Sequence, residues 1–176
     1  SSIDFLGAAP LTFSPPADAD GSFVRGFSPP FQVAAIATQY ICQVHDVGTT
    51  LRHVVAAEQV YSTASYGPYV HHVLVHACGA DLDAVTDMDL RQDAAFPCQK
   101  TSLSSKGTSP SGTGACTSIL YGGAVGGDPF VLPEEAGLLL GGEVRYIVVE
   151  AHLDNPALHT GANISDIVRF HTASTL

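Results

Sequence analysis

The sequence predicts an all-β fold, an antiparallel β-sandwich, and three observations indicate it. Short runs of β-branched and apolar residues recur along the chain. Pairs of glycine or proline separate these runs, as at Gly67-Pro68, Gly122-Gly123 and Gly141-Gly142. No segment shows a convincing 3.6-residue period of the kind that an amphipathic helix requires. Many short strands with turns between them are typical of two packed sheets.

Residues 1–30 differ in composition from the rest of the chain and are predicted to form an extended arm. Isolated aromatic residues lie between its prolines, which are Pro10, Pro15, Pro16, Pro29 and Pro30. Proline-rich sequence favours an extended chain that makes few internal hydrogen bonds. Two placements of the arm are open. It could wrap around its own domain, or its spaced aromatic side chains could dock on a neighbouring subunit and create a homo-oligomer.

Residues 31–176 are predicted to form the sandwich domain. Its clearest strands are the runs 33–47, 69–78, 143–152 and 164–171. The segment 51–61 comes nearest to a helical period, but Arg52-His53-Val54-Val55 suits a strand as well. The segment 101–118 is rich in Ser, Thr and Gly, so we expect a long loop there that offers hydroxyl groups for O-linked glycans.

The charge balance excludes several classes of partner. The 176 residues include 7 Lys and Arg against 17 Asp and Glu, which gives a formal net charge of −10. Nucleic acids and anionic membranes attract basic patches, so neither is an expected partner. Only 14% of the residues are charged and 45% are hydrophobic, which is enough apolar sequence for a sizeable core. The longest stretch without Asp, Glu, Lys or Arg, residues 59–80, contains three histidines and a proline, so no membrane span is expected.

Cysteine usage indicates a secreted, extracellular protein. The cysteines are Cys42, Cys78, Cys98 and Cys116, and none has the Cys-x-x-Cys spacing of a zinc ribbon or a thioredoxin-like site. Two disulfides formed in an oxidising compartment are the better interpretation. The sequon Asn163-Ile164-Ser165 offers a glycosylation site at Asn163. The chain begins at Ser1 without an apolar leader, as we expect of a mature secreted form.

The neighbouring pair His71-His72 is the most informative feature of the sequence. Adjacent side chains of a regular strand point to opposite faces. The two histidines can therefore share a metal only if the strand is irregular there or if they bind through different ring nitrogens. His152, near the end of another apolar strand, is the candidate third ligand, and three imidazoles without a thiolate suit copper or zinc. The alternative is that these are ordinary core or surface histidines. His76 could lie beside the site as a supporting group or be a structural histidine.

The order of these residues resembles a known family. The relevant segments are Thr38-x-Tyr40-x-Cys42, Tyr69 to Cys78 with the His71-His72 pair, Cys98, Cys116, Leu120-Tyr121, Leu132-Pro133, Gly141-Gly142 and Val148 to Pro156. Over residues 30–176, this pattern resembles the N-terminal domain of the copper type II, ascorbate-dependent monooxygenases. The combination of His-His-x5-Cys, four cysteines in order and a late His-x-x-Asn-Pro is fairly specific.

The resemblance implies a fold, a disulfide pairing and a site. The fold would be a β-sandwich of jelly-roll type, and the disulfides would be Cys42–Cys98 and Cys78–Cys116. His71, His72 and His152 would match the three-histidine copper site of the family. That site is mononuclear and passes electrons to a second copper, without contacting the hydroxylated substrate.

The departures from the family pattern limit what we expect of the chain. A second domain of the family supplies two histidines and a methionine for the other copper, whereas the single methionine here is Met88, in an acidic loop. Val73 and Leu153 replace a usual methionine and a usual aromatic residue. We therefore expect a one-copper domain that acts with a separate redox partner, binds copper for another purpose or has lost the metal, and not a complete hydroxylase. The alternative is a structural subunit of a glycosylated extracellular filament, assembled through residues 1–30.

Overall fold

The computed structural model describes residues 13–60, 69–79, 94–98, 116–124 and 126–176. Its strands form two antiparallel sheets, and no α-helix occurs in this part of the chain. The first sheet has the order β1 (Gly21–Gln32), β10 (Asn163–Ala173), β3 (Arg52–Gln59) and β7 (Phe130–Val131), with β8 (Leu138–Leu140) also paired to β3. The second sheet has the order β5 (Phe96–Pro97), β2 (Thr38–Asp46), β9 (Tyr146–Asp154), β4 (Val70–Cys78) and β6 (Cys116–Ala124).

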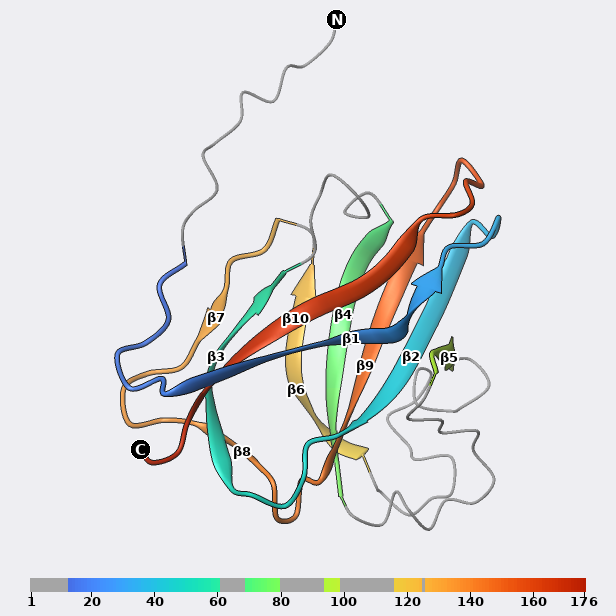
Figure 1. Cartoon of the computed structure of the whole chain (residues 1–176). Coiled ribbons are helices and arrows are strands. Elements are labelled where there is room, and N and C mark those ends of the chain that lie inside the picture. The colour runs from blue at the N-terminus through green and yellow to red at the C-terminus, as the bar shows by residue number, and fades with distance from the viewer. Residues whose placement is uncertain (1–12, 61–68, 80–93, 99–115, 125) are drawn as a thin grey trace, which may run out of the picture.

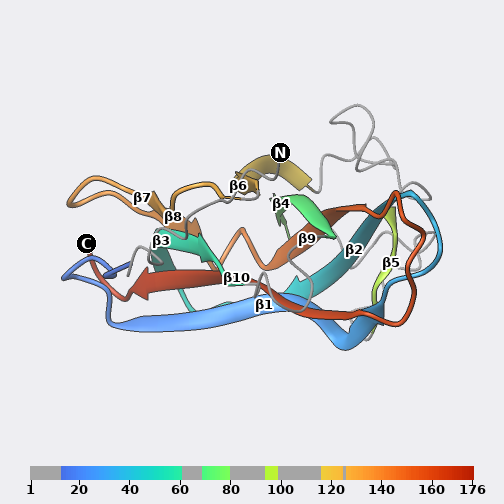
Figure 2. The same cartoon turned by 90° about the horizontal axis from the view of Figure 1, so that it is seen from above.

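The two sheets stack as the layers of a sandwich. In Figure 1, β1 and β10 cross in front of β4 and β9, and the turned view of Figure 2 shows β1 and β10 below β4 and β6. Apolar side chains of both sheets meet in one core, with Phe27 and Phe170 from the first sheet and Val73 and Val149 from the second. The prediction of an all-β antiparallel sandwich is confirmed, and the jelly-roll pattern of its connections stays a prediction.

Strand β9 is covered on both of its faces. One set of alternating residues, which includes Ile147, Val149 and Ala151, belongs to the core between the sheets. The other set, which includes Tyr146 and Val148, packs in a second apolar cluster. That cluster draws its residues from the second sheet and from Cys98, which directly follows β5, so it lies on the outer face of this sheet. Burial on both sides explains why this strand reads as a nearly continuous apolar run.

The structure begins the sandwich at Gly21, within the range 1–30 that the composition assigns to an arm. Strand β1 pairs with β10 from Gly21 opposite Thr172 to Arg25 opposite Val168, and its register shifts between Gly26 and Phe31. Pro29 and Pro30 fall in that irregular part. β1 is also an edge strand, where a missing backbone N–H is tolerated. The arm prediction therefore concerns the residues before Gly21, of which 1–12 lie outside the described residues.

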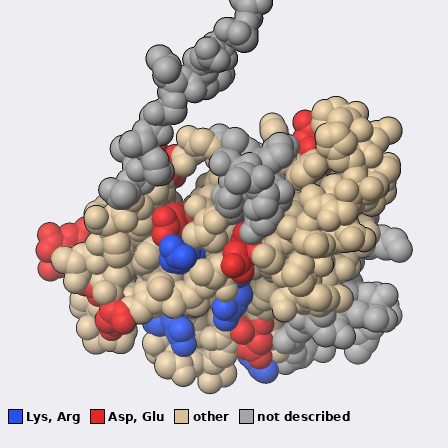
Figure 3. Space-filling model, turned by 45° about the horizontal axis from the view of Figure 1, so that its top comes forward, with Lys and Arg blue, Asp and Glu red and all other residues tan. Residues whose placement is uncertain are grey.

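Charged groups of both signs share the surface. On the face shown in Figure 3, the Lys and Arg side chains are interspersed with Asp and Glu. Within the described residues, no helix is long and apolar enough to cross a membrane. Met88 and most of the predicted loop 101–118 lie outside the described residues.

Candidate metal centre

Three histidines from two adjacent strands meet on the outer face of the second sheet. His71 and His72 lie near the start of β4, and His152 lies near the end of β9, where it is the direct cross-strand partner of His72. The pairing of β4 with β9 shifts register between Val70 and His72. Such an irregularity frees adjacent side chains from strict alternation, so His71 can turn toward the same side as His72. Of the two alternatives left open by the sequence, the structure therefore shows the irregular strand.

The ring nitrogens of the three histidines converge. Nδ1 of His72 lies 3.1 Å from Nδ1 of His71 and 3.2 Å from Nδ1 of His152. A ring nitrogen carries either a hydrogen or a lone pair, so Nδ1 of His72 cannot donate to one neighbour and accept from the other. A cation at the centre of the group would be bound by all three lone pairs instead.

The donor set fits a first-row metal ion. Nitrogen donors that bind one ion such as zinc at about 2.0–2.1 Å lie roughly 3 Å from one another, which is close to the separations observed between the Nδ1 atoms. Each histidine offers one ligand atom to the group, and these atoms all lie within 4.8 Å of one another. His71 is exposed, whereas His72 and His152 are partly buried. The group is therefore anchored on the sheet and open to solvent on one side.

Tyr40 holds the imidazole of His152 in place. The two residues are cross-strand partners of β2 and β9, and their rings stack at 4.4 Å between centroids with only 4° between planes. Nε2 of His152 is buried and has no hydrogen-bond partner among the described residues. Metal-binding histidines usually donate their other ring N–H to an oxygen that orients the ring. Here the stacked ring of Tyr40 orients the imidazole of His152 instead.

The environment of His152 favours its neutral form. Burial lowers the pKa of this imidazole, and the neighbouring His72 and His71 lower it further. Only the deprotonated nitrogen of an imidazole can bind a metal. The site therefore holds at least one donor in the form that metal binding requires.

A buried acid–base pair lies beside the three histidines. Glu150 is 4% exposed and is the cross-strand partner of Leu74. Each of these two residues lies two positions along its strand from the His72–His152 pair. Its Oε2 lies 3.3 Å from Nε2 of His76. His76 therefore contacts a carboxylate and lies outside the three-histidine group, and a supporting role for it at the site stays a prediction.

Two disulfides tie down the strands that carry the site. Cys42, two residues beyond Tyr40, is joined to Cys98, and Cys78 at the end of β4 is joined to Cys116 at the start of β6. These pairs are the ones that the family resemblance implies. Asn163, the predicted glycosylation site, is exposed at the start of β10, and its modification stays a prediction.

The sequence alone did not assign two of these contacts. Tyr40 belongs to the motif around Cys42, yet its stacking role depends on the register between β2 and β9. Glu150 interrupts an apolar run, and a lone charge in such a run is the available signal for a buried ion pair. The remaining described histidines lie outside the group, and three of them contact other partners: His45 with Gly26, His159 with Tyr69 and His171 with Glu58.

Comparisons with known proteins agree with this geometry. The model of the copper type II ascorbate-dependent monooxygenase N-terminal domain matches residues 27–160. Human dopamine beta-hydroxylase is 28% identical over 153 residues, which cover 85% of this chain and 23% of that protein. The horse dopamine beta-hydroxylase is 30% identical over 165 residues, 92% of this chain and 25% of that protein. Mouse DBH-like monooxygenase protein 1 is 29% identical over 140 residues, 77% of this chain and 21% of that protein.

The chain thus spans about a quarter or less of the length of these curated relatives. The matched family region contains both strands of the three-histidine group, and it begins within β1 and ends beyond β9. Sequence and structure therefore place the chain in the copper type II, ascorbate-dependent monooxygenase family, as a relative of its N-terminal domain.

Proposed function

We propose that this domain binds one copper ion through His71, His72 and His152 and serves in electron transfer. The convergence of the three Nδ1 atoms on one face of the sheet is the observation that carries the proposal. Bound copper would supply a one-electron redox couple. The family to which the chain belongs is copper-dependent, which favours copper over zinc as the ion.

The residues around the site prepare it in three ways. The paired strands β4 and β9 set the positions of His72 and His152 before a metal arrives. Tyr40 restricts the rotation of the His152 ring through stacking. A preorganised donor set loses less conformational entropy on binding, so the affinity is higher. The exposed His71 leaves one side open, which is where a separate redox partner would approach.

The two disulfides support an oxidising compartment as the place of action. We accordingly propose a secreted, extracellular protein, with Asn163 as its glycosylation site. The filament alternative stays a prediction. No described contact supports it, and residues 21–26 of the presumed docking arm pair with β10 of their own chain.

The test is a copper titration of the metal-free, untagged domain. We expect one equivalent of Cu(II) to bind, with nitrogen hyperfine structure in the electron paramagnetic resonance spectrum. The variants His71→Ala, His72→Ala and His152→Ala should each weaken binding by about 100-fold, since two imidazoles remain. His159→Ala is the matched control, because this exposed histidine is bound to Tyr69 and lies outside the group.

Unchanged affinity in the three variants, with circular dichroism showing a native fold, would contradict the proposal. Stronger binding of Zn(II) than of copper in both oxidation states would contradict the electron-transfer role, because zinc has no redox couple.

A further inference from the structure

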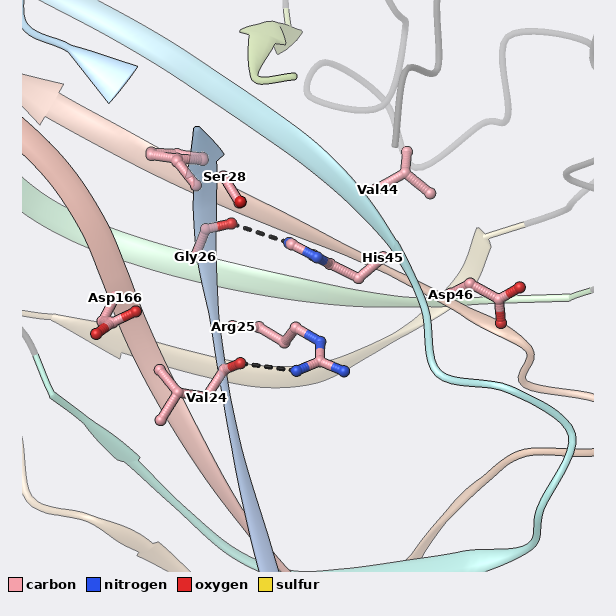
Figure 4. A pocket seen from close by; sticks show the side chains of 9 residues that line it. Val24, Arg25, Gly26, Ser28, Val44, His45, Asp46 and Asp166 are labelled. Carbon is pink, nitrogen blue, oxygen red and sulfur yellow. Dashed lines mark hydrogen bonds between the residues drawn. The ribbon is translucent and has the colours of Figure 1, made fainter. Parts of the chain in front are cut away.

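A cavity of about 350 Å³ lies where β1 of the first sheet faces β2 of the second. Residues 24–28 of β1, residues 44–46 of β2 and Asp166 of β10 line it (Figure 4). β1 is the edge strand of its sheet, and beyond β2 the other sheet continues only with the two-residue β5. The sandwich is therefore open at this side. A volume of this size is typical of small-molecule sites.

The cavity contains a guanidinium with spare hydrogen-bonding capacity. Phe23 and Phe27, two residues before and after Arg25, pack against or within the core, so Arg25 shares the inward face of β1. Nη1 of Arg25 donates to the carbonyl oxygen of Val24 at 2.8 Å, and Arg25 has no ion pair with a carboxylate among the described residues. A guanidinium carries five N–H donors, so most of the donors of Arg25 have no partner among the described residues.

The surroundings make the charge of Arg25 costly. Burial lowers the pKa of Arg25, and the positive charge of Arg52 lowers it further. Both cations lie close to the ring of Phe23, with Cζ of Arg25 4.8 Å and Cζ of Arg52 6.0 Å from its centroid. Partly buried charges are normally paired. An anion in the cavity would supply that pairing.

The acidic residues of the lining do not point at Arg25. The carboxylate of Asp46 is bound by Arg145 at 3.1 Å and by the backbone N–H of Gly48 at 2.7 Å. In Figure 4, Asp46 is directed away from the cavity and Asp166 lies on the other side of β1 from the guanidinium. His45 donates from Nε2 to the carbonyl oxygen of Gly26 at 2.9 Å and forms an uncharged wall. The cavity therefore offers one positive charge.

We propose that this cavity binds a small organic monocarboxylate, whose carboxylate group is held by the guanidinium of Arg25. The planar fork of arginine matches a carboxylate in a bidentate arrangement. A single cation with two aspartates nearby disfavours phosphate and other dianions, as does the net charge of −10. Apolar atoms of Phe27 supply a surface for the body of the ligand. The site uses none of the three metal-centre histidines and lies on the opposite face of the second sheet.

The experiment uses benzoate as the probe and follows the backbone amides of the folded chain by ¹⁵N NMR. We expect saturable shifts confined to residues 24–28 and 44–46, and none with benzamide, which has the same shape without the charge. Arg25→Gln should weaken benzoate binding by at least tenfold, as is typical for loss of a charge-assisted bidentate contact. Arg52→Gln removes the same charge from a residue that does not line the cavity, so it should change the affinity for benzoate by less than about threefold.

Absence of saturable shifts, equal shifts with benzamide, or equal weakening by the two arginine variants would overturn the proposal. If Arg25→Gln does not fold, Arg25→Lys retains the charge without the fork. That variant should bind benzoate several-fold more weakly than the wild type, and unchanged affinity in it would overturn the bidentate arrangement.

Discussion

His45 gives the domain a pH-dependent stability that can be measured in the absence of any metal ion. The imidazole lies between β1 and β2 and donates from Nε2 to the carbonyl oxygen of Gly26. Its pKa falls from 6.5 to about 4, mainly because burial disfavours the charged form and also because Arg25 is nearby. The bond to Gly26 acts in the opposite direction but does not compensate.

The sign of the effect follows from proton binding. Below pH 6.5 the unfolded chain protonates His45, while the folded chain keeps it neutral down to about pH 4. Protonation therefore favours the unfolded state, and stability present at neutral pH is lost as the pH falls. Between pH 7 and pH 5 the loss is about 2 kcal/mol, from roughly 1.5 pH units at about 1.4 kcal/mol each.

Urea unfolding at several pH values, with the disulfides intact, measures this loss. His45→Gln retains a donor for Gly26 and does not titrate, so its free energy of unfolding should fall by about 2 kcal/mol less than that of the wild type between pH 7 and pH 5. The matched control is His159→Gln, at an exposed position, which should follow the wild type. Parallel pH profiles for His45→Gln and the wild type would refute the reasoning.

Three further predictions concern the site and the core. Tyr40→Leu removes the stack on His152 and should weaken copper binding about 2- to 10-fold in a titration, whereas Tyr40→Phe should not; equal effects would exclude stacking as the cause. Phe170→Ala empties a fully buried position and should lower the free energy of unfolding by about 3–5 kcal/mol in urea, and a loss below about 1 kcal/mol would contradict its place in the core. Replacing Cys78 and Cys116 together by Ala opens a disulfide with a sequence separation of 38. This change should cost about 2–4 kcal/mol, measured in the same way, and an unchanged free energy would contradict the pairing.

The strands of the second sheet could be predicted well because burial on a face leaves a clear pattern. The run 69–78 forms β4, and the run 143–152 forms β9 with bounds shifted to Tyr146–Asp154. Strand β1 was not predicted, because Pro29 and Pro30 argue against a strand. Its edge position and its register shift accommodate these two prolines. The two-residue strands β5 and β7 form only because each pairs with a longer neighbouring strand, so no local sequence pattern predicts them.

The candidate site could be predicted only as far as residue types and spacing allow. The His71-His72 pair and His152 were visible in the sequence, but their approach depends on an irregularity between β4 and β9. The role of Tyr40 depends on three strands in register, since Tyr40 faces His152 and His152 faces His72. Long-range register is set by the whole sheet, so a local motif does not reveal it.

The position of His152 near the end of β9 explains how one strand makes the site both rigid and accessible. From Tyr146 to Ala151 this strand is buried on both faces, and its outer side chains pack against the Cys42–Cys98 disulfide and its neighbours. His152 is the first partly exposed residue, and Asp154, two positions further on, is exposed. The imidazole therefore lies where the outer cover ends, with its backbone held by two neighbouring strands. The proposed electron transfer needs ligands that do not move and a face that a partner can reach, and the end of this cover is where the fold provides both.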